Sequence, residues 1–327
     1  MRVFLRLGEA LSSEKLAVVV YFITSLLLLV LNKLLIARFF FDYPTVILMF
    51  QSAGLLFAIE LARMVNLFKL APYTFDRGKD MLAISVLHSL HVYTALTTLE
   101  GMSLPTLGTL KRLMPLVLIG LSFILLRRPL PSRRILASVG LVVLGSALAT
   151  TYDYSFDFWS CFYAGMHLGL GGLYMILVER LVANKNYSLL DIIYMNSFNN
   201  LVFFLIADMI QDEIRDAFMY FLTSSTVLFW WCLFGVLGMG IAMQISIFAI
   251  IVKRGSLDLS IYNAAKVTLQ TFFVFGTHFF LMFDIVPSAL NIIGCITCFA
   301  GNFLYSFYKR KENLTPLATS AQRKTLL

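Results

Sequence analysis

The sequence contains ten apolar segments of about 19–27 residues, separated by short stretches that hold most of the charged residues. An α-helix rises 1.5 Å per residue, so about 20 apolar residues cross the hydrocarbon core of a bilayer. Only 13% of the residues are charged, against about 25% in soluble domains. The sequence therefore predicts an all-α membrane protein with ten transmembrane helices, at roughly 16–37, 44–66, 81–100, 104–126, 134–152, 158–178, 189–210, 227–252, 257–283 and 288–308.

The positions of the lysines and arginines predict how the chain is oriented. When the ten segments are threaded in turn, 20 of the 26 lysines and arginines fall on the side that holds both termini. Cytosolic loops carry the excess of these residues, so residues 1–15 and 309–327 are expected to form a cytosolic N-terminus and a cytosolic tail. The net charge of +8 is spread over segment ends rather than gathered in a run, which argues against a nucleic-acid partner.

Two parts of the sequence resemble each other at a constant offset. PSRRILASVGLVVLGSAL at 131–148 matches PSALNIIGCITCFAGNFL at 287–304, so that Ser132 pairs with Ser288, 156 residues later. Because five is an odd number, two five-helix repeats in one chain insert with opposite topology. Inverted repeats are typical of secondary transporters, whose binding sites lie near the bilayer midplane. We therefore predict two inverted five-helix repeats, 16–152 and 153–308.

Three cations lie inside predicted helices, where each costs at least about 2.5–3.5 kcal/mol on insertion scales. Lys111 and Arg112 are in the fourth segment and Lys266 is in the ninth, 155 residues after Lys111. We interpret the three as an anion-binding site, in which each lysine supplies a point charge and the arginine a two-pronged donor. Tyr262 and Asn263, one turn before Lys266, add a stacking ring and an amide.

A row of amides marks the seventh segment. Asn196, Asn199 and Asn200 are spaced i, i+3, i+4 and so share one helix face. Hydrogen bonding between helices is one explanation, which is common for membrane asparagines. Nucleobase recognition is the other, because an amide offers both donors and acceptors. The residues alone favour neither.

Other polar residues carry weaker predictions. His88 and His91 are interpreted as hydrogen-bonding core residues, because two histidines without a third ligand make a poor metal site. Glu60 is the acid best placed to act in proton coupling. Cys295 and Cys298 form a C-x-x-C pair on an apolar helix, where zinc binding is not expected. No phosphate-binding loop, nucleophile elbow or carboxylate pair is present in the sequence, so we predict neither an enzyme nor a metal or cofactor.

Four stretches resemble a known family. LNKLLIARFFFDYPTVILMFQ at 31–51 is similar to its NK…P…Q pattern, and SLPTLGTLKRLMPL at 103–116 to a stretch of its UDP-sugar and GDP-mannose branch. YMNS at 194–197 stands where that branch has FYNN, the nucleotide-recognition motif. YNAAK at 262–266 stands where it has GALNK, linked to the sugar and diphosphate. With its ten spans and inverted halves, the chain resembles the nucleotide-sugar transporters (solute carrier family 35) of the drug/metabolite transporter superfamily.

The resemblance implies the drug/metabolite transporter fold and an antiporter that works by alternating access. A cytosolic nucleotide sugar would exchange for a lumenal nucleoside monophosphate, with a UDP-sugar favoured and a GDP-sugar open. The implied location is the Golgi membrane, with the endoplasmic reticulum as the alternative, and lipid and a second copy of the chain are candidate partners. The expected substrate-binding residues are Lys111, Arg112, Tyr194, Asn196, Ser197, Asn199, Tyr262, Asn263 and Lys266.

Three rival interpretations remain at this point. A sugar-phosphate/phosphate or other organophosphate exchanger of the same superfamily would share the fold and the cations but would not need a nucleoside pocket. A membrane enzyme would need a catalytic cluster. A purely structural membrane protein would leave the buried cations without a role.

Overall fold

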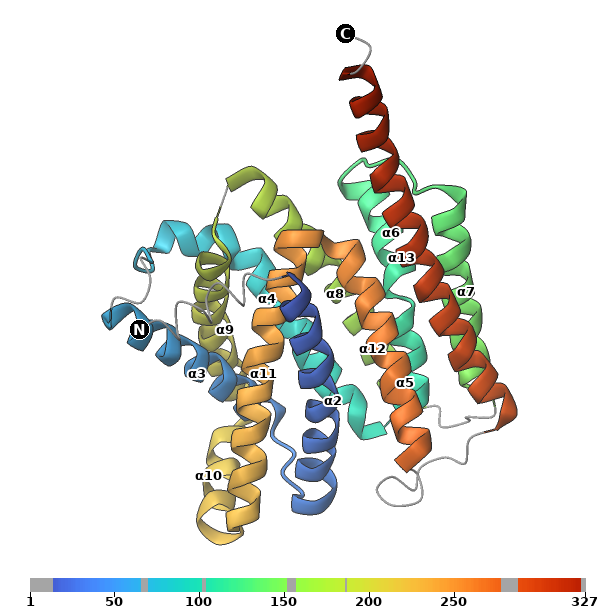
Figure 1. The fold of residues 1–327 in the computed structure, drawn as a ribbon. Coiled ribbons are helices and arrows are strands. Elements are labelled where there is room, and N and C mark those ends of the chain that lie inside the picture. The colour runs from blue at the N-terminus through green and yellow to red at the C-terminus, as the bar shows by residue number, and fades with distance from the viewer. Residues whose placement is uncertain are drawn as a thin grey trace. The chain divides into compact units, whose positions relative to one another are not determined.

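The computed structural model describes residues 14–65, 70–101, 104–151, 157–185, 187–277 and 288–324, and every element within these ranges is a helix (Figure 1). The predicted all-α fold is confirmed. Within the described residues, eight helical stretches are long and apolar enough to cross a membrane. Two of the ten predicted spans are not among them: one forms a helix of 17 residues, and the other is interrupted by polar residues that include Lys266. The count of ten therefore stays a prediction.

The chain divides into two compact units. Residues 1–100 and 158–259 form the first unit, and residues 101–157 and 260–327 form the second. Each unit draws helices from both predicted repeats, so a compact unit is not a repeat, and the repeat division stays a prediction. Three parts of these predictions lie outside the described residues: residues 1–13 of the predicted cytosolic N-terminus, the end of the ninth predicted span and the last three residues of the tail.

Most of the helices belong to the first unit. Its helices are α2 (Glu14–Phe39), α3 (Pro44–Met64), α4 (Phe75–Gly101), α8 (Phe158–Lys185), α9 (Leu189–Gln211), α10 (Glu213–Thr223) and α11 (Val227–Arg254). The second unit holds α5 (Leu104–Arg112), α6 (Met114–Leu125), α7 (Arg133–Ala149) and α13 (Ala289–Lys324). Helix α12 (Ser256–Thr277) begins in the first unit and continues into the second.

The fourth predicted span is not one continuous helix. Helix α5 ends at Arg112 and α6 begins at Met114. Pro115 explains the break, because it has no N–H to donate to the carbonyl of Lys111 and its ring clashes with that carbonyl. The backbone N–H of Leu116 donates to the carbonyl of Leu113, three residues back, at 3.0 Å, and the regular pattern resumes with Val117, whose N–H donates to the same carbonyl at 3.2 Å. A helix end therefore falls directly after the Lys-Arg pair.

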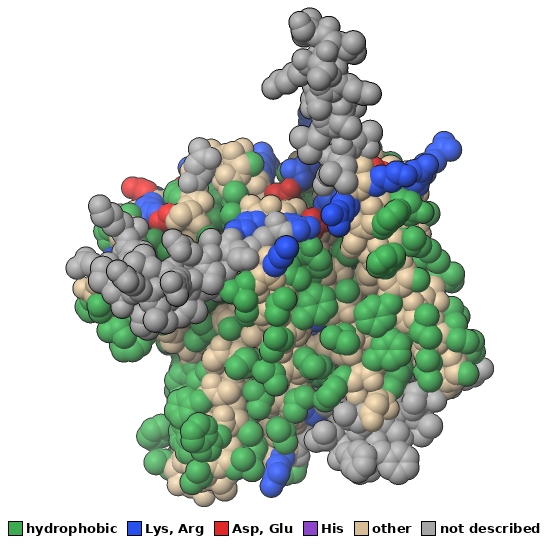
Figure 2. Space-filling view, viewed as in Figure 1, with side chains coloured by type: hydrophobic (Ala, Val, Ile, Leu, Met, Phe, Trp, Pro, Cys, Tyr) green, Lys and Arg blue, Asp and Glu red, His purple; other side chains and the backbone are tan. Residues whose placement is uncertain are grey.

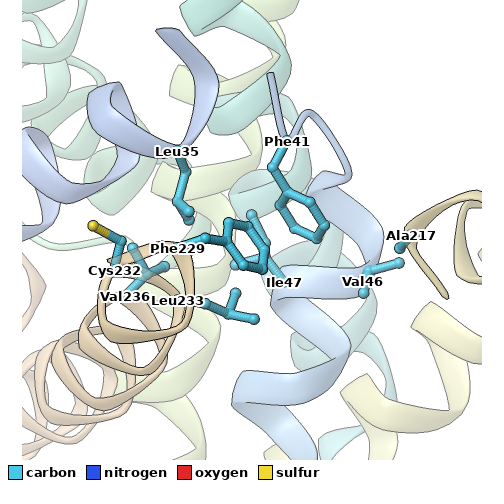
Figure 3. Packing of buried hydrophobic residues seen from close by; sticks show 9 residues of the cluster. All are labelled: Leu35, Phe41, Val46, Ile47, Ala217, Phe229, Cys232, Leu233 and Val236. Atoms are coloured by element: carbon cyan, nitrogen blue, oxygen red, sulfur yellow. The ribbon is translucent and has the colours of Figure 1, made fainter. Parts of the chain in front are cut away.

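An aromatic cluster holds α2, α3, α10 and α11 together in the first unit (Figure 3). The ring of Phe41 lies edge-on to Phe229 at 5.1 Å and stacks on Phe221 at 5.6 Å. Phe40 precedes it with φ of 51°, a turn that brings Phe41 back over the end of α2. Leu35 of α2 and Leu233 of α11 are fully buried beside these rings.

Glycines let α7 and α13 approach closely in the second unit. A Cβ atom on Gly145 would lie 2.7 Å from the backbone of Gly294, and one on Gly301 would lie 2.9 Å from the Ser138 carbonyl. As α7 advances from Ser138 to Ala149, its partners on α13 recede from Gly301 to Gly294. The two helices therefore run antiparallel, side by side (Figure 1).

Both of these helices also begin in the same way. The hydroxyl of Ser132 accepts a hydrogen bond from the Ile135 N–H at 3.4 Å, and the hydroxyl of Ser288 accepts one from the Asn291 N–H at 3.3 Å. A serine that accepts from the N3 residue is a standard N-cap and satisfies a donor that the helix leaves open. The caps are the serines that the sequence offset of 156 pairs.

Large apolar side chains cover the sides of the helices, as Figure 2 shows for one face. Met209 and Ile210 at the end of α9 are 86% and 84% exposed. Exposed apolar area of this extent is unusual on a soluble protein and is expected where lipid is the solvent. Together with the eight long apolar helices, it makes the chain a multi-pass membrane protein.

Candidate functional site

The predicted cations all belong to the second unit, on α5 and α12. Lys266 is 8% exposed and Lys111 is half-buried. The positive charge of Lys111 acts unfavourably on the Lys266 ammonium. Two like charges inside a membrane helix bundle repel each other and lack the hydration of water. An anion placed against both would relieve both costs.

Arg112 is the most deeply buried of the three cations, with no exposed area. Its Nε donates to the hydroxyl of Thr268 at 3.1 Å, and its Nη2 donates to the carbonyl of Val267 at 3.3 Å and to the hydroxyl of Thr271. Its Nη1 has no hydrogen-bond partner among the described residues. The guanidinium therefore fastens the end of α5 to α12, and it also interacts with the thiol of Cys295 on α13.

A carboxylate from α8 fixes the start of the helix that carries Lys266. Glu179 Oε2 accepts from the backbone N–H of Ser256 at 2.9 Å and from its hydroxyl. Gly255 precedes this cap with φ of +90°, a conformation that favours glycine. A carboxylate at a helix N-terminus satisfies open N–H groups and interacts favourably with the helix dipole. No sequence pattern indicates this contact, because the two residues are 77 positions apart.

The amide face of α9 lies in the first unit and packs against α4. Asn200 contacts His88 Nδ1 and Ser89 Oγ, both at 3.0 Å. In the orientation that satisfies both of its ends, the Asn200 oxygen also accepts from Asn196 Nδ2 at 3.1 Å. Asn196 Oδ1 and the hydroxyl of Ser197 are buried without a hydrogen-bond partner among the described residues. These two atoms can accept hydrogen bonds from a ligand.

Asn199 is fully engaged within the first unit. Its Oδ1 accepts from the hydroxyl of Tyr73 at 2.8 Å, and its Nδ2 donates to the Gly78 carbonyl at 3.1 Å and to Ser85 Oγ at 3.3 Å. The ring of Tyr73 stacks on Phe198, with centroids 3.9 Å apart. Asn199 therefore joins α9 both to α4 and to the segment that leads into it, which makes it less available to a ligand than Asn196.

The remaining predicted site residues lie on α9 and α12. The Tyr194 hydroxyl donates to Glu60 Oε1, and the other carboxylate oxygen of Glu60 pairs with Arg63 Nη2 at 2.7 Å. Tyr262 and Asn263 lie on α12 beside Lys266, and Asn263 is 9% exposed. The structure thus places the residues predicted to bind phosphate in the second unit and the residues of the α9 amide face in the first.

Histidine contacts extend beyond the two residues considered in the sequence. His91 on α4 pairs with His167 on α8, a residue that the sequence analysis did not single out. Nothing in the local sequence around position 167 indicates this partner, because the pairing depends on helix packing. Among the described residues, no group of three His, Cys, Asp or Glu side chains could hold a metal ion.

Comparisons with known proteins agree with this arrangement. The model of the Triose-phosphate Transporter family matches residues 14–306. The UDP-galactose/UDP-glucose transporter 7 of Arabidopsis thaliana is 26% identical over 297 residues, 90% of each chain. The GDP-fucose transporter 1 of the same plant is 26% identical over 190 residues, 58% of this chain and 54% of its own. A solved crystal structure with 15% identity and a TM-score of 0.58 covers 89% of this chain and 98% of its own.

The chain belongs to the Triose-phosphate Transporter family, whose model covers most of its length. It is a membrane transporter, and the predicted kinship with nucleotide-sugar transporters is confirmed. The likeness to the solved crystal structure is a likeness of fold alone.

Proposed function

We propose that the protein is an antiporter that exchanges a cytosolic nucleotide sugar for a lumenal nucleoside monophosphate. The observation that carries this proposal is that two lysines, Lys111 and the buried Lys266, lie inside the helices of a transporter of this family. Both substrates bring phosphate, which neutralises the two lysines. An empty carrier leaves the charges opposed, which raises the barrier to reorientation and favours exchange over one-way transport.

Phosphate binding would be shared among the three cations in distinct ways. The two lysines would act as movable point charges, while Arg112 already has three hydrogen bonds to α12. Its Nη1, which is buried and has no hydrogen-bond partner among the described residues, would donate one charge-assisted bond to a phosphate oxygen once the cavity opens to it. Tyr262 and Asn263, on the same helix as Lys266, would contact the sugar and diphosphate, as the family resemblance implies.

Base recognition would fall to the α9 face in the first unit. Asn196 Oδ1 and Ser197 Oγ, the buried atoms without a described partner, are the acceptors best suited to a nucleobase, with Tyr194 beside them. Asn199 would contribute by holding its neighbours in place. We favour a uridine nucleotide, because a UDP-sugar transporter matches over 90% of both chains, whereas the GDP-fucose transporter matches over about half of its own.

The proposed architecture is ten transmembrane helices in two inverted repeats. Under the sequence offset of 156, the contact of Ser138 with Gly301 maps onto the contact of Gly294 with Gly145, and both contacts occur. An exchange of this kind is what a two-fold axis between the antiparallel helices α7 and α13 would produce. The fold supports alternating access by rocking of one part against another.

The proposed location is the Golgi membrane, with both termini in the cytosol. The support is the lysine and arginine asymmetry of the loops together with the relatives' substrates, which are nucleotide sugars. A C-terminal tag should be digested by protease added outside intact vesicles. Protection of that tag would contradict the orientation.

The experiment that tests the proposed function is a thermal-shift screen of the purified protein. UDP-sugars and UMP should raise the melting temperature, GDP-sugars and GMP less, and triose phosphate and inorganic phosphate least. Lys266→Ala should abolish the shift and leave the protein folded, since it removes a buried charge with a like-charged neighbour. A shift with triose phosphate but none with nucleotides would favour the alternative, a sugar-phosphate/phosphate exchanger.

A further inference from the structure

A stacked pair of histidines joins α4 to α8 in the first unit. The rings of His91 and His167 lie with their centroids 4.0 Å apart and their planes 11° apart. His91 Nδ1 is 2.8 Å from the backbone carbonyl of His167, and His167 Nδ1 is 2.9 Å from the backbone carbonyl of His91. Each ring therefore bonds to the main chain of the other residue.

These contacts fix the tautomers of both rings. A backbone carbonyl only accepts hydrogen bonds, so each Nδ1 must carry a proton and donate it. The nitrogen that gains or loses a proton is then Nε2 in both rings. Both histidines lie well inside helices that are long and apolar enough to cross the membrane, where other titratable side chains are scarce.

The pair is built to hold one additional proton rather than two. A single imidazolium would keep its Nδ1–H bond to the carbonyl, strengthened by the charge, and would lie against the π face of the neutral ring. A second proton would place another positive charge about 4 Å from the first. At an effective dielectric constant near 20, this second proton would bind roughly a thousandfold more weakly than the first. A proton on one ring therefore opposes the binding of a proton to the other.

Among the described residues, the titratable groups around the pair include Tyr174, His88 and, next to Tyr174, Tyr21 on α2. Tyr174 on α8 lies 5.1 Å from His91, and His88 on α4 lies 5.3 Å from Tyr174. Helix α9 reaches this group through Asn200, which contacts His88, and α11 reaches it through Phe248, 5.8 Å from the same ring. His88 is thus a histidine of the same cluster with a different partner, which makes it a matched control.

We propose that His91 and His167 form a binding site for one exchangeable proton, and that this proton makes transport by the protein dependent on pH. The second half of the proposal rests on the proposed function, whereas the first half does not. The pair lies in the unit that holds the amide face, and neither histidine is among the residues assigned to the phosphates or the base. Proton binding would change the charge and the strength of the α4–α8 contact during the transport cycle.

The proton site can be observed directly by NMR of histidine-labelled protein in lipid bilayers. The chain has only four histidines, so His88→Asn, His91→Asn and His167→Asn assign the signals, and asparagine retains a donor near the position of Nδ1. As the pH falls from 8 to 5, one ring of the pair should become doubly protonated while the other stays neutral. His88→Asn should leave this titration unchanged. Two neutral rings at pH 5, or two rings that protonate together, would overturn the proposal.

Transport in proteoliposomes tests the second half. The measured quantity is the rate of UMP–UDP-sugar exchange at pH 5.5 divided by the rate at pH 7.5. This ratio should differ several-fold between the wild type and a His91→Asn/His167→Asn variant, whereas His88→Asn should keep the wild-type ratio. The comparison between variants cancels the titration of UMP itself, whose phosphate has a second pKa near 6. A double variant with the wild-type ratio would show that the proton takes no part in transport. Absence of exchange in the wild type would contradict the proposed function, while NMR would still decide on the proton site.

Discussion

Replacing Gly294 by alanine should disrupt the contact between α7 and α13. A Cβ atom at this position would lie 2.3 Å from the backbone nitrogen of Ala149 and 2.7 Å from the carbonyl oxygen of Gly145. These neighbours are backbone atoms of a helix, so they cannot swing aside as the end of a side chain could. The two helices would have to separate along this contact.

The size of the effect follows from two opposing terms. Overpacking of a well-packed site costs about 1–3 kcal/mol and occasionally more, and a contact this short with backbone belongs at the upper end. Alanine recovers about 1 kcal/mol relative to glycine within a helix. We expect a net loss of about 2 kcal/mol in the free energy of unfolding. At Gly140, on the same helix α7, an added Cβ would have nothing within 4 Å, so the alanine variant there should be neutral or gain up to about 1 kcal/mol.

The assay is the fraction of monodisperse protein that survives heating in detergent, measured by size-exclusion chromatography. Gly294→Ala should melt several degrees below the wild type, and Gly140→Ala should melt at or slightly above it. Equal melting temperatures for the two variants would refute the close packing of α7 and α13. Gly145→Ala, with backbone atoms of α13 at 2.7 Å, should behave like Gly294→Ala.

Three further predictions concern side chains that fasten one helix to another. Arg112→Lys keeps the charge but loses the paired hydrogen bonds of the guanidinium to α12, so the free energy of unfolding should fall by about 1–3 kcal/mol and the melting temperature should drop. An unchanged melting temperature would contradict the anchoring role. Glu179→Ala should cost about 1 kcal/mol by removing the cap of α12 at Ser256, and Glu179→Gln should cost less; equal losses would contradict capping. Burial raises the pKa of the Glu213 carboxyl, which accepts from the Thr45 N–H at 2.9 Å. A raised folded-state pKa contributes stability that is present below the ordinary value of 4.5 and is lost as the pH rises through the folded-state value. Glu213→Gln, which cannot ionise, should therefore gain stability relative to the wild type between pH 4 and pH 7, and a constant difference would contradict the prediction.

Hydropathy located the long helices but not the short helix α10, which lies between two predicted spans. Each of the ten predicted spans coincides with described helix over most of its length, because lipid requires long apolar stretches with their backbone hydrogen bonds satisfied internally. The break after Arg112 was missed, although Pro115 signals it. A single proline within a long apolar segment is compatible with one kinked helix or with two helices, and the length of the segment favours neither.

The candidate site was predictable in its residue types but not in its contacts. Lys266 and Arg112 stand out in the sequence because charged residues are rare in apolar segments. The structure shows that both are deeply buried. The bond of Asn199 to Tyr73, by contrast, joins residues 126 positions apart, and the His91–His167 pair joins residues 76 positions apart. Helix packing determines which residues become partners, and the pattern of a single sequence does not reveal that packing.

Counterflow in proteoliposomes tests the central claim most directly. Vesicles loaded with UMP and supplied with labelled UDP-sugar should accumulate label rapidly, and empty vesicles should accumulate almost none. Vesicles loaded with GMP should support less uptake, and Lys266→Ala should abolish uptake in every case. Equal uptake into loaded and empty vesicles would contradict exchange, and uptake driven by inorganic phosphate but not by UMP would contradict the nucleotide-sugar assignment.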